Sequence, residues 1–426
     1  MQVAALVRSL HPAEIAELLE SLPPAQRAIV WDLVDEEDEG DVLLELNDEV
    51  RASILERMDA EDVVAATEGM SLDDLADFVA DLPEAVTRQV LRSLSEQDKE
   101  RLQKVLAYPE DSAGGLMDPD TISVRPDVSL EVVLRYLRIL GEIPDRTDAI
   151  WVVDRNDRFL GTLYLARLVS REPQATVSQV MDRELKPIPY DRSASEVARE
   201  FSNRDLLSAP VVDAEGRLIG QITIDDVVDV IEDQAEHDFL SMAGLDEEDD
   251  MFAPVITSAQ RRTIWLAVNL ATAFVAAAVV GLFEATLQQV VVLAVLMPVV
   301  ASMGGIAGSQ TLTLMIRGMA MGRVQGANAR WLLRKEVAVG ILNGLAWALV
   351  VAGITVAFFG TWEVGLVIAA AIAINLVVAA LAGFAVPLLL KKLRIDPALA
   401  GSVVLTTITD VVGFMSFLGL GTLFLT

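Results

Sequence analysis

A single acidic side chain stands inside the apolar C-terminal segment of the sequence. Asp410 lies in "TTITDVVGF" (406–414), within a stretch that is almost wholly apolar from Ala398 to Thr426. At a rise of 1.5 Å per residue it is roughly 16 Å into the segment, near the middle of a bilayer. A charge there costs at least about 2.5 to 3.5 kcal/mol and usually faces a bundle interior or a wet pathway. The alternative is a protonated carboxyl that is hydrogen-bonded to a neighbouring span.

Small and hydroxyl side chains accompany this carboxyl. We expect Ser402, Thr406, Thr409 and Gly413 to lie on the same helical stripe as Asp410, which would give a polar face suited to water or a cation. The candidate metal-binding residues of a pore are therefore Asp410, Thr406, Thr407, Ser402 and Gly413.

The second apolar segment carries another irregularity, "MPVVASMGGIAGSQTLTLMIRG" (297–318). Proline and clustered glycine weaken a helix and can leave carbonyl oxygens free, which at membrane depth is tolerated only inside protein or along a cavity. The candidate pore-lining residues here are Gly304, Gly305, Gly308, Ser309 and Gln310. The alternative is that Gly304 and Gly308 form a GxxxG contact that only packs helices. The pattern leaves both interpretations open.

Five segments are long and apolar enough to cross a bilayer: approximately 264–283, 290–315, 337–359, 364–390 and 399–425. Lys and Arg flank them on one side only, and the connectors "FEATLQQ" and "FFGTWEV" contain neither. The positive-inside rule then predicts a cytoplasmic N-terminus, five spans and a C-terminus outside.

Charge divides the 426 residues into two halves. Up to Arg262 there are 25 Lys and Arg against 58 Asp and Glu, a net of −33, whereas 263–426 hold 8 against 5, a net of +3. The start of the chain reads as an acidic amphipathic helix, so we expect no cleavable signal. There is no cysteine and there are only two histidines, so a bound metal would need oxygen ligands.

Short amphipathic helices punctuated by "LPP" and "LPE" fill residues 1–107. "IAELLESLPPA" (15–25) is echoed at an offset of 60 by "LADFVADLPEA" (75–85), which favours stacked helical pairs in an α-superhelix. Asp73, Asp74 and Asp77 crowd one short helix of this domain. Such a cluster is a candidate cation site, and the alternative is an ordinary solvated surface.

Strands and helices then alternate. "AIWVVDRNDRFLGTLYLARLV" (149–169) and "SAPVVDAEGRLIGQITIDDVV" (208–228) repeat one unit of strand, Asp-containing turn, strand and helix. This order resembles a tandem pair of CBS domains, at 108–171 and 172–231. Thr223 and Asp226 match the position where such domains hold an adenosine ribose, and they also suit a turn and helix cap. A connecting, or plug, helix and a strongly acidic stretch follow at 232–262, before the transmembrane domain at 263–426.

The whole order resembles the MgtE family of magnesium channels. The motifs that carry the resemblance are "YPEDSAGGLM" (108–117), "PVVASMGGIAGSQ" (298–310), "RKEVAVGILNG" (334–344) and "DPALAGSVVLTTITDVVGF" (396–414). The fold class expected is a multidomain membrane protein with an α-superhelical N-terminal domain, tandem α/β CBS domains, a connecting helix and five transmembrane helices.

The resemblance also implies a function and its residues. Asp410 matches the pore carboxylate, which pairs with its symmetry mate in a homodimer in the cell (inner) membrane to bind hydrated Mg²⁺. The positions that match regulatory Mg²⁺ sites are Asp73, Asp74, Asp77, Asp205, Asp226, Asp238 and Asp396. The expected function is inward passage of Mg²⁺ that cytoplasmic Mg²⁺ shuts off, with ATP as a further ligand of the CBS pair. No enzymatic activity or nucleic-acid partner is expected.

The sequence departs from the family at several positions. Ile306 stands where the family usually has Asn, and "AGSVV" (400–404) replaces a more usual Ser, Gly or Asn, Pro arrangement before the Thr pair of the fifth span; both bear on pore geometry and ion preference. Gln234 and His237 occupy connecting-helix positions that are commonly Glu. The alternatives are a broader divalent-cation transporter that also carries Co²⁺ and a membrane sensor that transports nothing. An intramembrane aspartyl protease needs two catalytic Asp residues, and one chain offers a single mid-span Asp.

Overall fold

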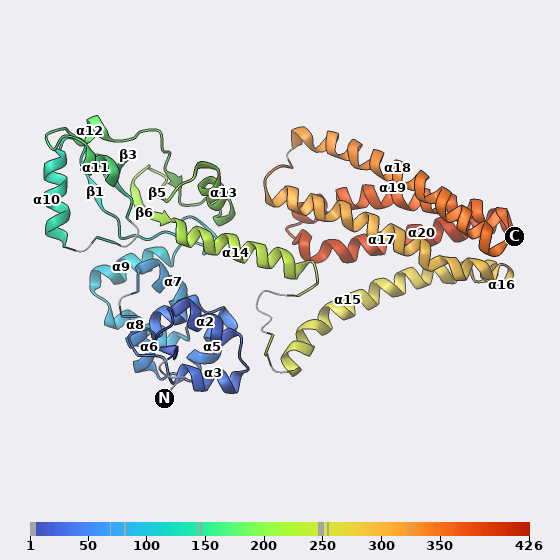
Figure 1. The fold of residues 1–426 in the computed structure, drawn as a ribbon, viewed down its shortest axis with the longest axis horizontal. Coiled ribbons are helices and arrows are strands. Elements are labelled where there is room, and N and C mark those ends of the chain that lie inside the picture. Colours follow the sequence, from blue (N-terminus) through green and yellow to red (C-terminus); the bar gives the residue numbers. More distant parts are fainter. Residues whose placement is uncertain are drawn as a thin grey trace. The chain divides into compact units, whose positions relative to one another are not determined.

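The computed structural model describes residues 6–68, 70–80, 82–141, 143–144, 147–245, 251–253, 255–324 and 326–426. It forms two compact units (Figure 1). The first, the N-terminal unit, comprises Met1–Ala235 and Glu248–Ala253, and the second, the membrane unit, comprises Glu236–Glu247 and Pro254–Thr426. The acidic stretch at 246–250 lies outside the described residues.

Short helices build the first part of the N-terminal unit. They are α2 (Pro12–Glu20), α3 (Pro24–Trp31), α4 (Glu39–Glu45), α5 (Asp48–Leu55), α6 (Ala60–Ala66), α7 (Leu72–Ala80), α8 (Glu84–Ser93) and α9 (Glu96–Val105). Local sequence sets where they begin: Asn47, Asp59 and Ser95 accept hydrogen bonds from the first free backbone N–H groups of α5, α6 and α9. Pro23 and Pro83, from the "LPP" and "LPE" signals, immediately precede α3 and α8.

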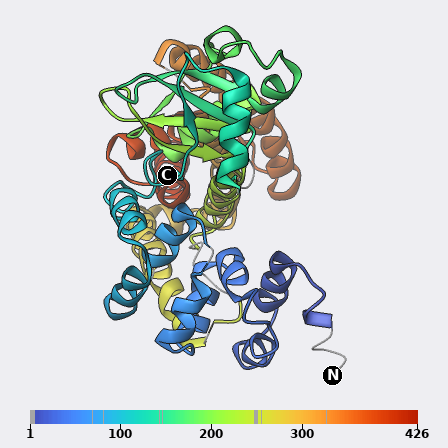
Figure 2. The same ribbon diagram turned by 90° about the vertical axis from the view of Figure 1, so that its left-hand side faces the viewer.

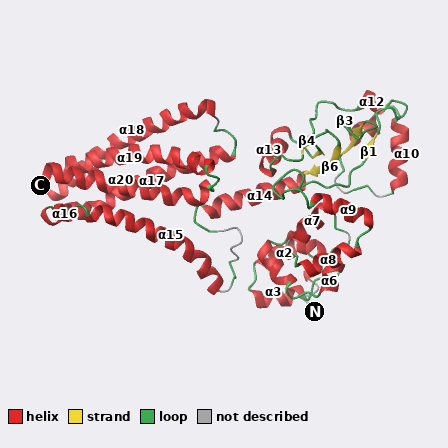
Figure 3. Cartoon of the chain, turned by 180° about the vertical axis from the view of Figure 1, so that it is seen from behind, coloured by secondary structure: helices red, strands yellow, loops and turns green. Residues whose placement is uncertain are grey.

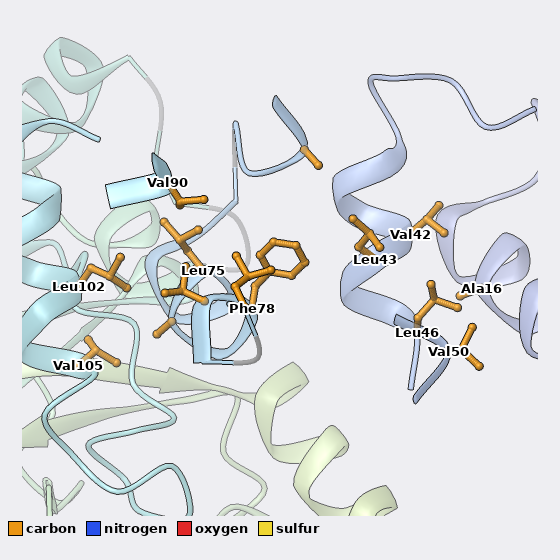
Figure 4. Packing of buried hydrophobic residues seen from close by; sticks show 14 of the residues in the cluster. Ala16, Val42, Leu43, Leu46, Val50, Leu75, Phe78, Val90, Leu102 and Val105 are labelled. Carbon is orange, nitrogen blue, oxygen red and sulfur yellow. The ribbon is translucent and has the colours of Figure 1, made fainter. Parts of the chain in front are cut away.

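Helices two apart in the chain pack on one another, as in a superhelix: α2 on α4, α4 on α6, α6 on α8, α3 on α5 and α7 on α9. Their apolar faces meet in a continuous core that includes Val42, Leu43, Leu75 and Phe78, all almost fully buried (Figure 4). The predicted α-superhelical domain is therefore confirmed.

Two three-stranded sheets follow. Their strands are β1 (Ser123–Val124), β2 (Ala149–Val153) and β3 (Phe159–Tyr164), then β4 (Ile188–Pro189), β5 (Ser208–Val212) and β6 (Leu218–Thr223). In each sheet the first strand runs parallel to the second and the second antiparallel to the third, and both second strands carry a register shift at the same place. The two sequence repeats thus form sheets of the same topology, as expected for a CBS pair.

Helices cover these sheets. They are α10 (Leu130–Leu140), α11 (Leu165–Ser170), α12 (Val177–Val180) and α13 (Ala194–Arg204), and α14 (Ile224–Ser241) follows β6. Val133 and Leu137 of α10 pack on Ile150 of β2, and Figure 2 shows α10 beside the first sheet. The core of the second sheet is continuous with that of the N-terminal helices.

Five long helices dominate the membrane unit, whose arrangement Figure 3 shows from behind. They are α15 (Val255–Gly281), α17 (Val291–Ala320), α18 (Gly326–Phe359), α19 (Trp362–Lys392) and α20 (Pro397–Leu425), with the short α16 (Glu284–Gln289) after α15. All five are long and apolar enough to cross a membrane. They match the five predicted spans. Helix α19 is the most buried of them and packs on α17, α18 and α20.

A buried hydrogen bond joins the two CBS repeats. The indole Nε1 of Trp151, in β2, donates to Oε1 of Gln221, in β6, at 2.8 Å, and Trp151 is fully buried. We expect Trp151→Phe to lower the free energy of unfolding by about 1 to 3 kcal/mol, because it leaves the Gln221 oxygen buried and unpaired. Denaturant unfolding with amide hydrogen exchange of β2 and β6 measures this.

Two further variants make the test specific. Combining Trp151→Phe with Gln221→Leu removes both partners and should restore part of the lost stability. Trp331→Phe changes an exposed tryptophan and serves as the control. Equal stability of the single and double variants would contradict this role of the hydrogen bond.

Candidate functional site

Helix α20 presents two adjacent stripes of different character. Residues spaced four apart, among them Gly401, Leu405, Thr409 and Gly413, are buried inside the bundle. Ser402, Thr406 and Asp410 each follow one of these by a single position and so lie about 100° further round the helix. They are half-buried or exposed. Thr409 and Gly413 are buried where helices pack, whereas Asp410 is half-buried and lines the hollow described below, so the expected single polar stripe is divided between packing and exposed positions.

Helix α17 shows the same division. Val300, Gly304, Gly308 and Leu312 are buried, whereas the residues that follow Gly304 and Gly308 point away from the bundle core. The helix is continuous, with Pro298 inside it, so the irregular backbone expected from this segment is not found among the described residues. The polar side chains of α17 are therefore positioned by the exposed face of an intact helix, and not by a break in the helix.

The two outward stripes together line a hollow of about 950 Å³ within the membrane unit. Its lining comprises Ala301, Ser302, Gly305, Ile306, Ser309, Gln310, Thr313, Leu314, Thr406 and Asp410. The hollow thus brings together five of the predicted pore residues: Gly305, Ser309, Gln310, Thr406 and Asp410. Ser402, Thr407, Gly304, Gly308 and Gly413 are not part of this lining.

Glycines explain how the helices approach closely enough to form this arrangement. A Cβ on Gly308 would come within 2.9 Å of the Leu405 side chain, and one on Gly383 within 2.7 Å of the Gly308 carbonyl oxygen. A Cβ on Gly305, by contrast, would meet nothing within 4 Å. Of the two interpretations of Gly304 and Gly308, helix packing is the one that the geometry favours, while Gly305 faces the hollow.

The oxygens of the hollow are suited to a hydrated cation. Thr406 Oγ1 donates to the Ser402 carbonyl at 2.9 Å, which leaves its lone pairs able to accept hydrogen bonds. Within the described part of the chain the Asp410 carboxylate has no hydrogen-bond donor or ion-pair partner. Among the described residues no neighbouring helix supplies the hydrogen bond that a protonated, internally paired carboxyl requires, which favours the prediction of a wet pathway.

Two buried polar residues of the membrane unit escaped the sequence analysis. Glu336, in α18, is 6% exposed, and its carboxylate accepts from Thr311 Oγ1 at 3.3 Å and from Lys335 Nζ at 2.9 Å. Asn375, in α19, is fully buried. Both are polar residues within or beside apolar segments, and this position could have marked them as candidates. Only the three-dimensional arrangement shows that they face other helices.

A cluster of acidic residues lies within the N-terminal unit. Burial raises the pKa of both Asp118 and Asp226 to about 7, and in each case the next cause is the charge of Asp73. Loss of hydration and the neighbouring charges of Asp73 and Asp74 likewise raise the pKa of Asp77 to about 7. The structure thus brings the predicted Asp73, Asp74, Asp77 and Asp226 together, and it adds Asp118.

The negative charge of this cluster could be neutralised by a bound cation. Its members are Asp73, Asp74, Asp77, Asp118 and Asp226. Oδ1 of Asp73 is buried and has no hydrogen-bond partner. Across the described ranges, no three acidic or histidine side chains converge closely enough to hold an ion directly. These carboxylates would therefore hold a hydrated Mg²⁺ through its water ligands.

The remaining predicted regulatory positions lie elsewhere. Asp205 is an exposed C-cap of α13 with a left-handed backbone conformation, φ 52°. Asp396 accepts from the backbone N–H groups of Ala398 and Leu399 at the start of α20, and His237 Nε2 lies 3.4 Å from its Oδ2. Asp238 is half-buried in α14.

The two candidate ribose-binding residues, Thr223 and Asp226, are hydrogen-bonded to each other. The backbone N–H and Oγ1 of Thr223 both donate to Oδ2 of Asp226, at 3.1 and 3.2 Å, and Oγ1 also bonds to Asp225. This is the turn and helix cap that the sequence allowed as the alternative to a nucleotide site.

The helical array, the CBS pair and the five apolar helices define a multi-pass membrane protein with a large N-terminal unit. Family models match three parts of it: MgtE intracellular N domain at residues 10–111, CBS domain at 113–172 and 177–233, and MgtE, a divalent cation transporter, at 297–420.

Individual proteins are similar along almost the whole chain. The magnesium transporter MgtE of Thermus thermophilus is 30% identical over 99% of this chain and 94% of its own length. The same-named protein of Bacillus subtilis is 26% identical over 99% and 93%. Among solved structures, the cytosolic domain of the Mg²⁺ channel MgtE in complex with ATP is 32% identical over 53% of this chain and 93% of that one, with a TM-score of 0.49. The chain belongs to the MgtE family.

The raised pKa values make the acidic cluster sensitive to pH. The pKa of these carboxyls is 3.8 in the unfolded chain and about 7 in the folded protein. Their contribution to the stability of the fold is therefore fully present at low pH, and it is lost as the pH rises through 7. In the absence of Mg²⁺ we expect α7 and α14 to open less readily at about pH 6 than at about pH 8. Amide hydrogen exchange of the full chain, corrected for the intrinsic pH dependence of exchange, measures this opening.

On the prediction that this cluster binds Mg²⁺, the ion should remove most of that pH dependence, because it would neutralise the same carboxylates. Asp73→Asn should weaken the pH dependence, since Asp73 perturbs both Asp118 and Asp226, whereas Asp127→Asn changes an exposed surface Asp and should not. Equal opening at both pH values in the unmodified chain would show that the cluster does not control these helices.

Proposed function

We propose that this protein passes Mg²⁺ through the membrane along the hollow between α17 and α20. The observation that carries the proposal is the Asp410 carboxylate, which lies among hydroxyl and amide oxygens in an open hollow of about 950 Å³ along the apolar helices α17 and α20. The magnesium transporters of the same family support the choice of ion. In this proposal a homodimer places two such stripes face to face, and two Asp410 carboxylates flank the ion.

The chemistry of Mg²⁺ fits few direct protein ligands. The ion demands octahedral oxygen coordination and sheds water reluctantly, so it usually keeps several water ligands. Six waters occupy roughly 180 Å³ at about 30 Å³ each, well within the hollow. Asp410 would accept hydrogen bonds from these waters and balance the charge of the ion, while Ser309, Gln310 and Thr406 would accept others.

The membrane potential supplies the driving force for inward flow. It contributes about 2.3 kcal/mol per elementary charge per 100 mV, hence about 4.6 kcal/mol for a divalent ion. In this proposal the protein lies in the cell (inner) membrane with its N-terminal unit in the cytoplasm. No chemical step is then needed for Mg²⁺ to enter.

Regulation would come from the acidic N-terminal unit. When cytoplasmic Mg²⁺ is scarce, carboxylates such as Asp73 and Asp226 repel one another. When it is abundant, Mg²⁺ binds them and stabilises the compact form by RT ln(1 + [L]/Kd) per site. The transported ion would thereby close its own pathway, with Asp205, Asp238 and Asp396 as further sites. ATP binding at the CBS pair would require Thr223 and Asp226 to exchange their mutual hydrogen bonds for bonds to a ribose.

A broader divalent-cation transporter is the second candidate, and Ile306 is the observation that favours it. This apolar side chain is 58% exposed and lines the hollow. It offers no oxygen to the water shell of an ion, so discrimination between Mg²⁺ and Co²⁺ would rest on the other lining groups. Uptake of both ions by the same vesicles decides between the two candidates.

Neutralising Asp410 tests the proposed function. We expect Asp410→Asn and Asp410→Ala to lower Mg²⁺ uptake into proteoliposomes by at least about tenfold, which corresponds to about 1.4 kcal/mol of lost ion stabilisation. The amide keeps the size of the side chain and removes only its charge. Asp410→Glu keeps the charge and should retain part of the flux.

Glu363→Gln provides the matched control, because Glu363 is an exposed carboxylate at the start of α19 and does not line the hollow. Its uptake should equal that of the unmodified protein. Undiminished uptake by Asp410→Asn in correctly folded protein would rule out the hollow as the route.

A further inference from the structure

Asn375 is a fully buried amide near the middle of α19, the most buried helix of the membrane unit. Its neighbours in the core are apolar, among them Ile372, Leu376 and Val300. A primary amide in such surroundings is costly unless its polar atoms are paired. Packing alone does not require a polar side chain here, so the amide calls for a specific reason.

The contacts of the Asn375 nitrogen supply that reason, whereas Oδ1 is buried and has no hydrogen-bond partner among the described residues. Its Nδ2 donates to the backbone carbonyl of Val300, in α17, at 3.0 Å. A Cβ on Gly304, in α17, would lie 2.2 Å from Nδ2, and a Cβ on Gly413, in α20, would lie 2.7 Å from the same atom. The amide therefore fills a slot between Gly304 of α17 and Gly413 of α20, and it donates a hydrogen bond to the Val300 carbonyl of α17.

The slot lies directly behind the hollow. Gly304 precedes Gly305, which lines the hollow, and Gly413 is one helical turn from Asp410. A change in the separation or rotation of α17 and α20 at this level would move Gly305 relative to Asp410. Asn375 itself does not line the hollow, so any effect it has on an ion must act through these helices.

We propose that Asn375 is a positioning residue for ion passage, whose side-chain amide sets the separation and rotation of α17 and α20 and so the geometry of the oxygens around Asp410. This rests on the proposed function for its effect on flux, but the positioning of the helices is independent of it. A side chain of similar volume without the Nδ2 donor would pack, yet would leave α17 free to turn.

Asn375→Leu tests this, with Leu376→Ala as a control that disturbs the same core from the next residue. We expect Asn375→Leu to lower Mg²⁺ uptake by about tenfold or more and to change the ratio of Mg²⁺ to Co²⁺ uptake, because misplaced ligands lose discrimination as well as rate. Leu376→Ala should lower the melting temperature but leave that ratio unchanged. A merely structural role for Asn375 predicts the same outcome for both variants.

A second pair of variants tests the slot directly. Gly304→Ala should impair uptake because its methyl group collides with the amide, and Asn375→Ala in the same chain should restore part of it by removing the collision. No restoration, together with an unchanged ion ratio in Asn375→Leu, would overturn the proposal.

A readout without ion flux separates this proposal from the proposed function. Spin labels on cysteines introduced at Ser309 and Thr406 report the distance between α17 and α20 in the full chain, which contains no native cysteine. We expect the distribution to shift or broaden in Asn375→Leu and not in Leu376→Ala. An unchanged distribution overturns the positioning role, whereas a shifted distribution in a protein that takes up no Mg²⁺ would leave it standing and refute only transport.

Discussion

The close approach of α17, α19 and α20 is the constraint on which the membrane unit depends. Side chains that project into these contacts must be small, as at Gly304, Gly308 and Gly413, or must fit a slot, as Asn375 does. Because an α-helix turns by 100° per residue, fixing one stripe inside fixes the neighbouring stripe outside. The buried glycines thus determine, without touching an ion, that Thr406 and Asp410 face the hollow.

Much of this organisation could be predicted from the sequence, because it depends on period and composition. The five apolar spans, the helical array and the CBS repeat all have signals many residues long. The assignment of single residues to the hollow or to the bundle could not be predicted in the same way. Thr409 and Asp410 are adjacent and both polar, and only contact with a neighbouring helix decides which one is buried.

The same limit explains which site residues were missed. Asp118 is remote in sequence from Asp73, and their electrostatic coupling arises only when the chain segments after α9 fold beside α7. Glu336 and Asn375 looked like isolated polar residues because their partners, Thr311 and Val300, lie on another helix. Both units therefore contain buried polar groups whose partners are distant in sequence, acidic side chains in the N-terminal unit and helix contacts in the membrane unit.

Water accessibility of the two stripes is the most direct test of this arrangement. Because the chain has no cysteine, single cysteines at Ser309 and Thr406 can be compared with Thr311 and Thr409, which are 6% and 0% exposed. In membranes, a charged thiol reagent should modify the first pair, and Mg²⁺ should slow that reaction. The second pair should remain unmodified. Equal modification of Thr409 and Thr406, or no modification of Ser309, would contradict the division into a buried stripe and an ion-facing one.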